Sequence, residues 1–184
     1  MLTVNPPPAL DAPTRWAIAA RDGDSAAQVA FVRATQEEVW RFVAALVDVN
    51  AADDLTQETY LRAFRALPRF EARSSVRTWL LGIARRTCAD HLRAVIRKRR
   101  LEARLATESL TELPHPDPSG QISAAALLNR LSAARREAFV LTQLLGLSYE
   151  QAAATLEVPI GTIRSRVARA RADLVADVVT ALAA

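Results

Sequence analysis

Arginines that recur on one face of a predicted helix near the end of the chain are the residues best suited to chemistry. This helix begins near Thr162, and its outward face mixes arginines with small residues: Arg164, Ser165, Ala168, Arg169 and Arg171. Small side chains let a helix approach the floor of the DNA major groove, where an arginine can donate two hydrogen bonds to O6 and N7 of one guanine. The pattern favours a DNA-reading helix, and the alternative is an ordinary solvated arginine face.

The opposite face of this helix and the segment before it predict a helix-turn-helix. The apolar stripe that should be buried consists of Ile163, Val167, Ala170 and Leu174. Upstream, Ser148 can cap a shorter, alanine-rich helix, which Pro159 ends because the residue before a proline avoids the α region. Two short helices joined by a tight turn form a helix-turn-helix, which we place at residues 148–173.

A second set of arginines follows a predicted helix that begins near Val76, after a cap at Ser75. Its basic face contains Gly82, Arg85, Arg86, Ala89 and Arg93 and runs into the cluster Arg97-Lys98-Arg99-Arg100. The loop before it contains Phe70. Arginines beside an aromatic side chain suit a phosphate backbone with a base stacked nearby. Arginines near a helix C-terminus also complement the helix dipole, so spacing alone leaves both interpretations open.

The predicted helix over 54–67 has one buried stripe and one acidic stripe. The buried stripe should contain Thr56, Tyr60, Ala63, Phe64 and Leu67. The other stripe contains Asp54, Gln57, Glu58 and Leu61, at the spacing i, i+3, i+4, i+7. An exposed leucine framed by acids suits a contact with a partner helix. Composition alone favours the simpler interpretation, a solvated acidic face with one stray leucine.

The whole pattern predicts an all-α chain with two small helical domains joined by a Pro-rich linker, the second domain containing the helix-turn-helix. Abundant alanine and an aromatic content of 5% favour helices over strands. We expect a flexible tail at 1–14, a first domain at 15–100, the linker at 101–121 and a second domain at 122–184.

Within the first domain, a helix break is expected at 22–24, and a further helix should cover 36–49. The buried residues of that further helix should be Val39, Trp40, Phe42, Val43 and Leu46. Asp53 is expected to cap the helix that follows. In the second domain, a helix should cover 133–145 and end before Gly146.

Composition limits the classes of protein that the chain can represent. The formal net charge is +4, and Lys98 is the only lysine among 24 basic residues. This balance suits a nucleic acid or an acidic partner. The single cysteine, Cys88, rules out a disulfide within the chain and fits a reducing compartment. With no apolar run long enough to span a bilayer and no signal-peptide pattern, we expect a cytoplasmic protein without membrane insertion.

Three motifs, in this order along the chain, resemble the extracytoplasmic-function (ECF) sigma factors of bacterial RNA polymerase. Residues 53–64, DDLTQETYLRAF, resemble the polymerase-binding helix of sigma region 2.2. Residues 73–80, RSSVRTWL, resemble regions 2.3 and 2.4, and residues 147–166 are similar to region 4.2. Each motif alone is moderately specific, but the ordered set with a linker before the last is strong. The resemblance covers about residues 22–174.

The resemblance implies a role for each surface. Core RNA polymerase would be bound, through the clamp helices of its largest subunit, by Asp54, Gln57, Glu58 and Leu61. The minus-ten element of promoter DNA, with one base flipped into the loop 70–75, would be contacted by Phe70, Arg73, Ser74, Ser75, Arg77, Trp79, Arg85, Arg86 and Arg93. The minus-35 element would face Arg164, Ser165, Ala168, Arg169 and Arg171. Transcription initiation and promoter opening are therefore the implied function.

The same resemblance implies no catalytic residue, no metal and no cofactor. Family members often have an anti-sigma factor, which is a further candidate partner, and the sequence leaves its existence open. Two departures bear on specificity. Ala168 stands where relatives often have a larger residue, and Glu71-Ala72-Arg73 stands where many have a glycine and a different acid. These positions leave the sequence preference and the flipped base open.

Two other classes of protein remain as alternatives. Asp53, Asp54 and Glu58 could hold a magnesium ion in a nuclease-like site, although no further ligands lie at metal spacing. Cys88, His91 and His115 are too few and too scattered for a zinc site. A dimeric repressor or a response-regulator output domain could use the same helix-turn-helix, but either would normally need a sensory or dimerisation module.

Overall fold

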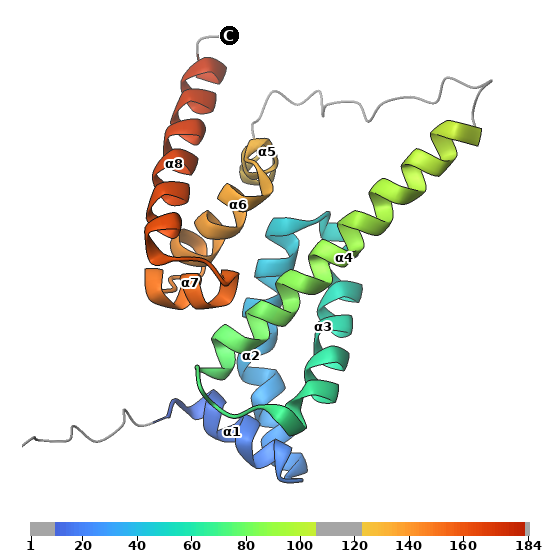
Figure 1. Ribbon diagram of the computed structural model, residues 1–184, viewed down its shortest axis with the longest axis vertical. Helices are drawn as coiled ribbons and strands as arrows, with labels where there is room; N and C mark the ends of the chain where they lie inside the picture. Colours follow the sequence, from blue (N-terminus) through green and yellow to red (C-terminus); the bar gives the residue numbers. More distant parts are fainter. Residues whose placement is uncertain (1–9, 106–122, 183–184) are drawn as a thin grey trace, which may run out of the picture.

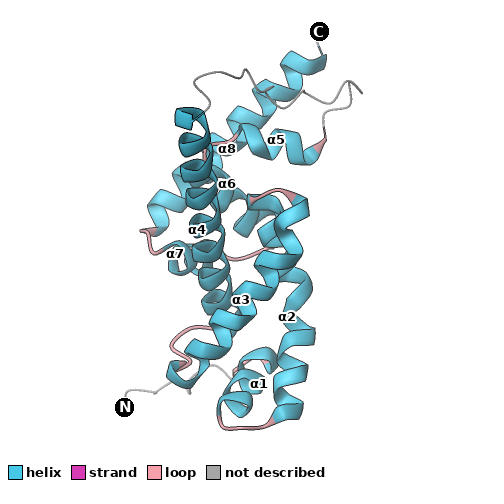
Figure 2. Ribbon diagram, turned by 90° about the vertical axis from the view of Figure 1, so that its right-hand side faces the viewer, coloured by secondary structure: helices cyan, strands magenta, loops and turns pink. Residues whose placement is uncertain are grey.

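The computed structural model describes residues 10–105 and 123–182, and every regular element in these ranges is helical (Figure 1, Figure 2). The α-helices are α1 (Ala12–Arg21), α2 (Ser25–Leu46), α3 (Ala52–Ala66), α4 (Val76–Leu105), α5 (Ala124–Arg130), α6 (Ala133–Phe139), α7 (Tyr149–Leu156) and α8 (Ile160–Leu182). Short 3-10 turns cover Val49–Ala51 and Leu67–Arg69. The all-α expectation is confirmed, while most of the predicted linker lies outside the described residues.

The first bundle, α1 to α4, begins earlier and is less interrupted than the sequence predicted. Asp11 accepts a hydrogen bond from the Thr14 amide at 2.7 Å and starts α1 at Ala12, inside the segment predicted as tail. The break at 22–24 is confirmed, with Gly23 at φ +103° and Asp24 capping α2. The predicted break before residue 36 is wrong. The Thr35 hydroxyl donates to the Phe31 carbonyl at 2.8 Å, so α2 runs through this position.

The start of α3 also differs from the prediction. The cap position is Ala51, which has no capping side chain, and Asp53 lies in the first turn. Asp53 instead accepts a hydrogen bond from the Trp40 indole N–H at 2.7 Å. Trp40 was predicted to be buried but is 37% exposed, because its indole N–H turns towards the exposed Asp53 of α3.

Aromatic residues fill the centre of the first bundle. Phe31 is fully buried, and its ring meets those of Tyr60 and Phe64 edge-on, with centroids 6.2 and 6.3 Å apart. The Tyr60 hydroxyl lies 2.7 Å from that of Thr35, so the buried phenol keeps a hydrogen-bond partner. Burial raises the pKa of Tyr60 to about 12, which keeps the phenol protonated at neutral pH.

The second bundle, α5 to α8, contains the predicted helix-turn-helix. Ser148 and Gln151 exchange side-chain and backbone hydrogen bonds in a capping box at the start of α7. After Leu156 the chain turns at Glu157, which has φ +56°, and α8 begins at Ile160. The predicted stripe of α8 faces inward, with Ile163, Val167 and Ala170 buried. The predicted helix 133–145 changes to a five-residue π-helix, Val140–Leu144, before Gly146 at φ +69°.

The two bundles pack against each other, and the buried apolar residues of both form one continuous cluster. In Figure 1, α7 lies against the first half of α4, while α5 and α6 adjoin the end of α2. The last turns of α4 project beyond both bundles, and residues 96–103 there are exposed. The two-domain sequence therefore folds here into one compact arrangement of two bundles.

The loop between α3 and α4 contains a strained residue. Ala72 has φ +53°, in the left-handed region that glycine adopts without steric cost. A side chain with a Cβ atom costs about 1–2 kcal/mol in this conformation. This strained residue lies within Glu71-Ala72-Arg73, the stretch that departs from the pattern of the resembled family.

We predict that Ala72→Gly raises the free energy of unfolding by about 1 kcal/mol, because it removes the left-handed penalty. The matched control is Ala89→Gly in the middle of α4, which should lower it by about 1 kcal/mol through loss of helix propensity. Urea unfolding followed by circular dichroism measures both changes. Equal destabilisation by the two substitutions would contradict the strain at Ala72.

Candidate nucleic-acid and protein interfaces

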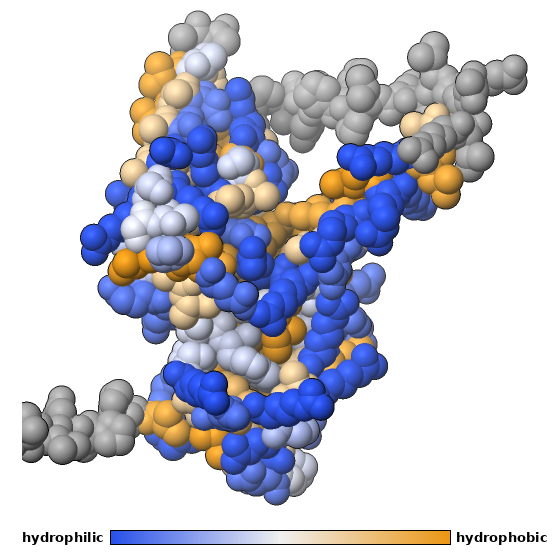
Figure 3. All heavy atoms as spheres, in the orientation of Figure 1, coloured by the Kyte–Doolittle hydropathy of each residue, from blue (hydrophilic) through white to orange (hydrophobic). Residues whose placement is uncertain are grey.

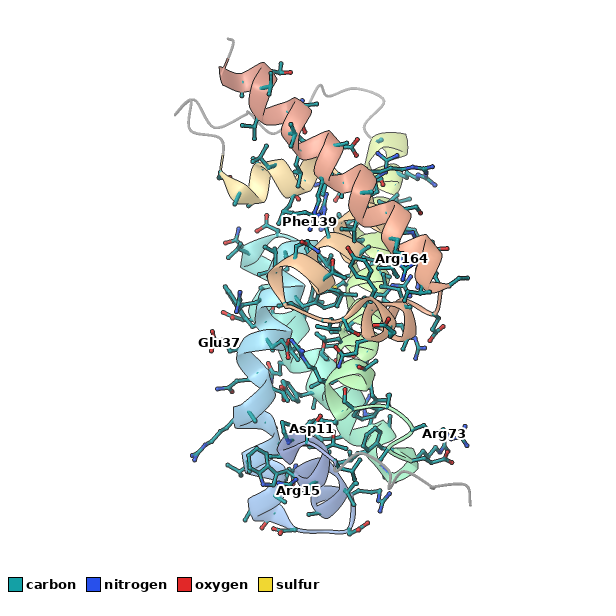
Figure 4. The ribbon with its side chains drawn as sticks, turned by 90° about the vertical axis from the view of Figure 1, so that its left-hand side faces the viewer. Asp11, Arg15, Glu37, Arg73, Phe139 and Arg164 are labelled. Carbon is teal, nitrogen blue, oxygen red and sulfur yellow. The ribbon has the colours of Figure 1, made fainter. Side chains whose placement is uncertain are left out.

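The outward face of α8 presents all five residues predicted to face the minus-35 element. Arg164, Ser165, Ala168, Arg169 and Arg171 are exposed. Figure 4 labels Arg164 near the start of α8. The Arg171 guanidinium donates to the Gln143 side-chain oxygen at 2.6 Å, which ties this arginine to the neighbouring element. The face is thus accessible to a large ligand, although its role in DNA binding stays a prediction.

The loop Phe70–Ser75 and the start of α4 enclose a small cavity of about 190 Å³. Its lining consists of Arg69, Phe70, Glu71, Ala72, Arg73, Ser74 and Trp79. Phe70 is buried rather than an exposed stacking platform, and its ring centroid lies 4.8 Å from that of Trp79. The exposed Arg73 pairs with Glu71 at 2.5 Å. The structure therefore gathers Phe70, Arg73, Ser74 and Trp79 around one cavity.

Three arginines of α4 that were predicted to border DNA contact the second bundle instead. Arg77 pairs with Glu38 of α2 and also donates to the Leu145 carbonyl. The Arg85 Nε donates to Glu137 of α6 at 3.0 Å, and Arg86 pairs with Glu157 after α7. The sequence shows the charge of these side chains but not which carboxylates reach them. In this arrangement the side chains of Arg77 and Arg85 are 32% exposed and that of Arg86 is 62% exposed, so the basic face predicted for α4 is only partly covered.

The remaining part of the basic face of α4 points away from the second bundle. Arg93 is exposed and pairs with Asp90 of the same helix at 2.5 Å. Beyond it, residues 97–100 are exposed along the projecting end of α4. Figure 3 shows a band of hydrophilic residues along this helix. The basic residues of α4 thus fall into two sets: Arg77, Arg85 and Arg86 pair with carboxylates outside α4, whereas Arg93 and residues 97–100 face away from the second bundle.

The acidic stripe of α3 lies on the surface. Asp54, Gln57 and Leu61 are exposed, the leucine to 47%. Glu58 accepts a hydrogen bond from Arg62 at 2.7 Å, and Arg62 also reaches Asp90 of α4 at 2.6 Å. The Arg62 guanidinium holds the pKa of Asp90 below its usual value. This network fixes Glu58 along the helix and leaves the other three side chains free for a partner.

Beside this stripe lies a cavity of about 430 Å³ between α2 and α3, which the sequence did not predict. Its lining includes Trp40 and Thr56, both of which were predicted to be packed in the interior. Helical periodicity places Trp40 on the inner face of α2, but it does not show whether the ring is packed in the interior or lines a cavity. The only available signal was the polar neighbourhood of Asp53 and Gln57.

The acidic, cysteine and histidine side chains considered for a magnesium or zinc site do not form one in the described part of the chain. Over residues 10–105 and 123–182, no three His, Cys, Asp or Glu side chains form a group that could hold a metal ion. Asp53 is bound by Trp40, and Glu58 by Arg62. Cys88 is buried, and burial raises the pKa of its thiol to about 12. His115 lies outside the described residues. No helix within the described ranges has the length and apolar character needed to cross a bilayer.

Comparison with known proteins places both bundles. Residues 28–99 match the family model described as Sigma-70 region 2, and residues 122–174 match Sigma-70, region 4. The chain is 51% identical over 169 residues to the ECF RNA polymerase sigma factor SigC of Mycobacterium tuberculosis, covering 91% of each protein. It is 33% identical to the ECF RNA polymerase sigma factor SigE of Mycolicibacterium smegmatis, covering 89% of this chain and 67% of that protein.

Two solved structures extend the likeness to three dimensions. CnrH in complex with the cytosolic domain of CnrY gives a TM-score of 0.71 at 28% identity, covering 92% of this chain and 99% of that one. RpoE of Bartonella quintana, in complex with the anti-sigma factor NepR, gives a TM-score of 0.60 at 34% identity, covering 78% and 91%. With both sigma regions matched in order and half of its residues shared with SigC, the chain belongs to the ECF sigma factors of RNA polymerase.

Proposed function

We propose that three surfaces of this sigma factor divide the work of transcription initiation. The acidic stripe of α3 binds core polymerase, the loop 70–75 with α4 binds and opens the minus-ten element, and α8 reads the minus-35 element. The observation that carries this proposal is the exposure of both α8 and the α3 stripe on a chain that contains sigma regions 2 and 4. We place the first functional unit at 12–105, because α1 begins at Ala12 and α4 runs to Leu105 beyond the predicted boundary at 100, and the second unit at 122–184.

The role proposed for α8 is supported by the composition of its outward face. Three arginines surround the small side chains of Ser165 and Ala168, so the backbone of α8 can approach base edges closely. Arg171 of this face is already engaged by its hydrogen bond to the Gln143 side chain. Arg164 and Arg169 are therefore the stronger candidates for base recognition.

We predict that Arg169→Ala weakens holoenzyme binding at the minus-35 element by about 1–3 kcal/mol, the worth of one bidentate arginine–guanine contact. Arg130→Ala serves as the control, since Arg130 pairs with Asp177 away from this face. Promoter titration with DNase footprinting gives the affinity of each variant. An unchanged upstream footprint for Arg169→Ala would argue against the assignment.

The role proposed for the loop 70–75 is supported by its cavity. The half-buried Trp79 ring, backed by the buried Phe70, offers a surface for a flipped base, and Arg73 and Ser74 offer hydrogen bonds to the base edge. Unstacking one base costs a few kcal/mol, which such a preformed site can offset. Promoter opening in this proposal begins with capture of one minus-ten base here.

The arginines of α4 reach DNA in this proposal only after the two bundles separate. Arg85 and Arg86 are paired with carboxylates of the second bundle, and α7 covers the adjoining face of α4. Duplex phosphates would replace Glu137 and Glu157 as the anionic partners of these arginines. The closed arrangement is then a form of the free protein that core polymerase or DNA must open.

We predict that the double substitution Glu137→Gln, Glu157→Gln separates the bundles, because it leaves Arg85 without an anionic partner in a partly buried place. Fluorescence transfer between labels on α3 and α8 should fall, and run-off transcription at limiting core should rise. Glu102→Gln, on the projecting end of α4, is the control. Unchanged transfer in the double variant would show that these pairs do not hold the bundles together.

The role proposed for α3 depends on its exposed acidic stripe. We predict that Asp54→Ala and Gln57→Ala each weaken core binding by roughly tenfold, which corresponds to about 1.4 kcal/mol. The fold should persist because both side chains are exposed. Asp22→Ala, an exposed aspartate after α1, is the charge-matched control. Fluorescence anisotropy with core polymerase measures the affinity, and unaltered binding by both variants would refute the role of this stripe.

An anti-sigma factor is a second proposed partner. This proposal is supported by the two structural neighbours: RpoE was solved with the anti-sigma factor NepR, and CnrH with the cytosolic domain of CnrY. A cytoplasmic location follows for a protein whose partners are core polymerase and DNA. Co-purification of the tagged chain from its native host, followed by mass spectrometry, tests for such a partner.

A further inference from the structure

The cavity between α2 and α3 is lined by both apolar and polar side chains. It encloses about 430 Å³. Figure 4 labels Glu37 on α2. Val32 and the rings of Trp40 and Tyr60 supply the apolar lining, while Gln36, Glu37, Asp53, Thr56 and Gln57 supply polar groups. This distribution is typical of a site that receives an apolar group with polar flanks.

The walls of this cavity are held in place before any partner binds. The Trp40 indole is fixed by its 2.7 Å hydrogen bond to Asp53, and Tyr60 by its 2.7 Å contact with Thr35. A fixed indole that remains 37% exposed is a strong anchor, because little side-chain entropy is lost when a partner covers it. The cavity is thus preformed rather than dependent on induced fit.

Thr56 supplies a second, independent sign that something else completes this site. Its hydroxyl oxygen is buried and has no hydrogen-bond partner in the described part of the chain. A buried polar atom without a partner is costly in a native protein and needs an explanation. Because Thr56 lines the cavity, a group that enters the cavity can satisfy or cover this hydroxyl.

The surroundings indicate the chemistry of the partner. Gln57 belongs both to the cavity lining and to the stripe proposed to bind polymerase, so the two surfaces are continuous. Glu37 and Asp53 of the lining, with Asp54 beside them, give this surface a negative charge. The complementary ligand is a helix that carries arginine or lysine around one apolar side chain.

We propose that this cavity is the anchor site for one leucine- to phenylalanine-sized side chain of a basic helix of core polymerase. The inference rests on the proposed function of the α3 stripe and adds to it a specific socket with Trp40 as its principal wall. The acidic residues attract and orient the helix, and insertion into the socket supplies the apolar part of the affinity. Thr56 lies at the base of the contact.

The test fills the socket without altering its charge. Thr56→Phe places a ring in the cavity, and we expect the affinity for core polymerase to fall at least tenfold in fluorescence anisotropy. Thr180→Phe, the same change at an exposed position of α8, is the matched control and should bind core like the original chain. Circular dichroism melting of each variant checks that the bundle remains folded.

A second variant, Trp40→Ala, enlarges the socket instead of filling it. It removes the principal wall and should also weaken core binding at least tenfold, so the proposal can be tested even if Thr56→Phe does not fold. If both variants bind core normally while Asp54→Ala does not, the socket is overturned and the proposed role of α3 stands. If Asp54→Ala, Gln57→Ala and both socket variants all bind normally, the proposed polymerase surface itself fails.

Discussion

The packing of the second bundle on α2 and α4, an apolar contact bordered by arginine–carboxylate pairs, is the interaction on which the closed arrangement depends. Arg85 meets Glu137 and Arg86 meets Glu157, while Arg77 reaches the Leu145 carbonyl. Glu137 is only 15% exposed in its side chain, so its pair with Arg85 is the better shielded from solvent. A partly buried charge is costly unless it is paired, so Arg85 and Glu137 need each other while the bundles are packed, whereas the exposed Arg86–Glu157 pair contributes little. The same property makes the contact reversible, since DNA phosphates can serve the same arginines.

Packing of the two bundles leaves some of the proposed binding surfaces accessible and covers part of another. The outward faces of α3 and α8 remain accessible while the bundles are packed, because neither lies between them. The first half of α4 does lie between them, against α7. A partner that meets α3 first therefore encounters an intact surface, whereas a partner of Arg85 or Arg86 encounters one that is already occupied. The order of events in initiation is thus constrained by geometry as well as by affinity.

Sequence reasoning was strongest where one local rule determined the outcome. The capping box at Ser148, the turn before Pro159 and the stripe of Ile163 and Val167 all depend on neighbours within one or two helical turns, and each was confirmed. The arginines and small residues of α8 were exposed for the same reason. Local rules were sufficient because α7 and α8 pack mainly through contacts that their own periodicity specifies.

Sequence reasoning failed where the contact partner of a side chain is distant in the sequence. Asp53 was assigned to a cap but is bound by Trp40, thirteen positions earlier, and this single hydrogen bond also left the tryptophan exposed. Arg85 and its partner Glu137 are 52 positions apart. The socket between α2 and α3 requires residues from both helices, so neither helical pattern reveals it. These features result from tertiary packing, which a single sequence does not encode in its periodicity.

The unbroken course of α4 gives the molecule a mechanical property. Thirty residues at about 1.5 Å each form a rod of about 45 Å, from the loop proposed to bind a base to the arginines at its far end. No proline interrupts this helix, so α4 turns as one body and a tilt at the loop moves the opposite tip. In the proposed mechanism, α4 would thereby couple capture of one nucleotide at the loop to duplex about one helical turn away, pivoting on its packing against α3.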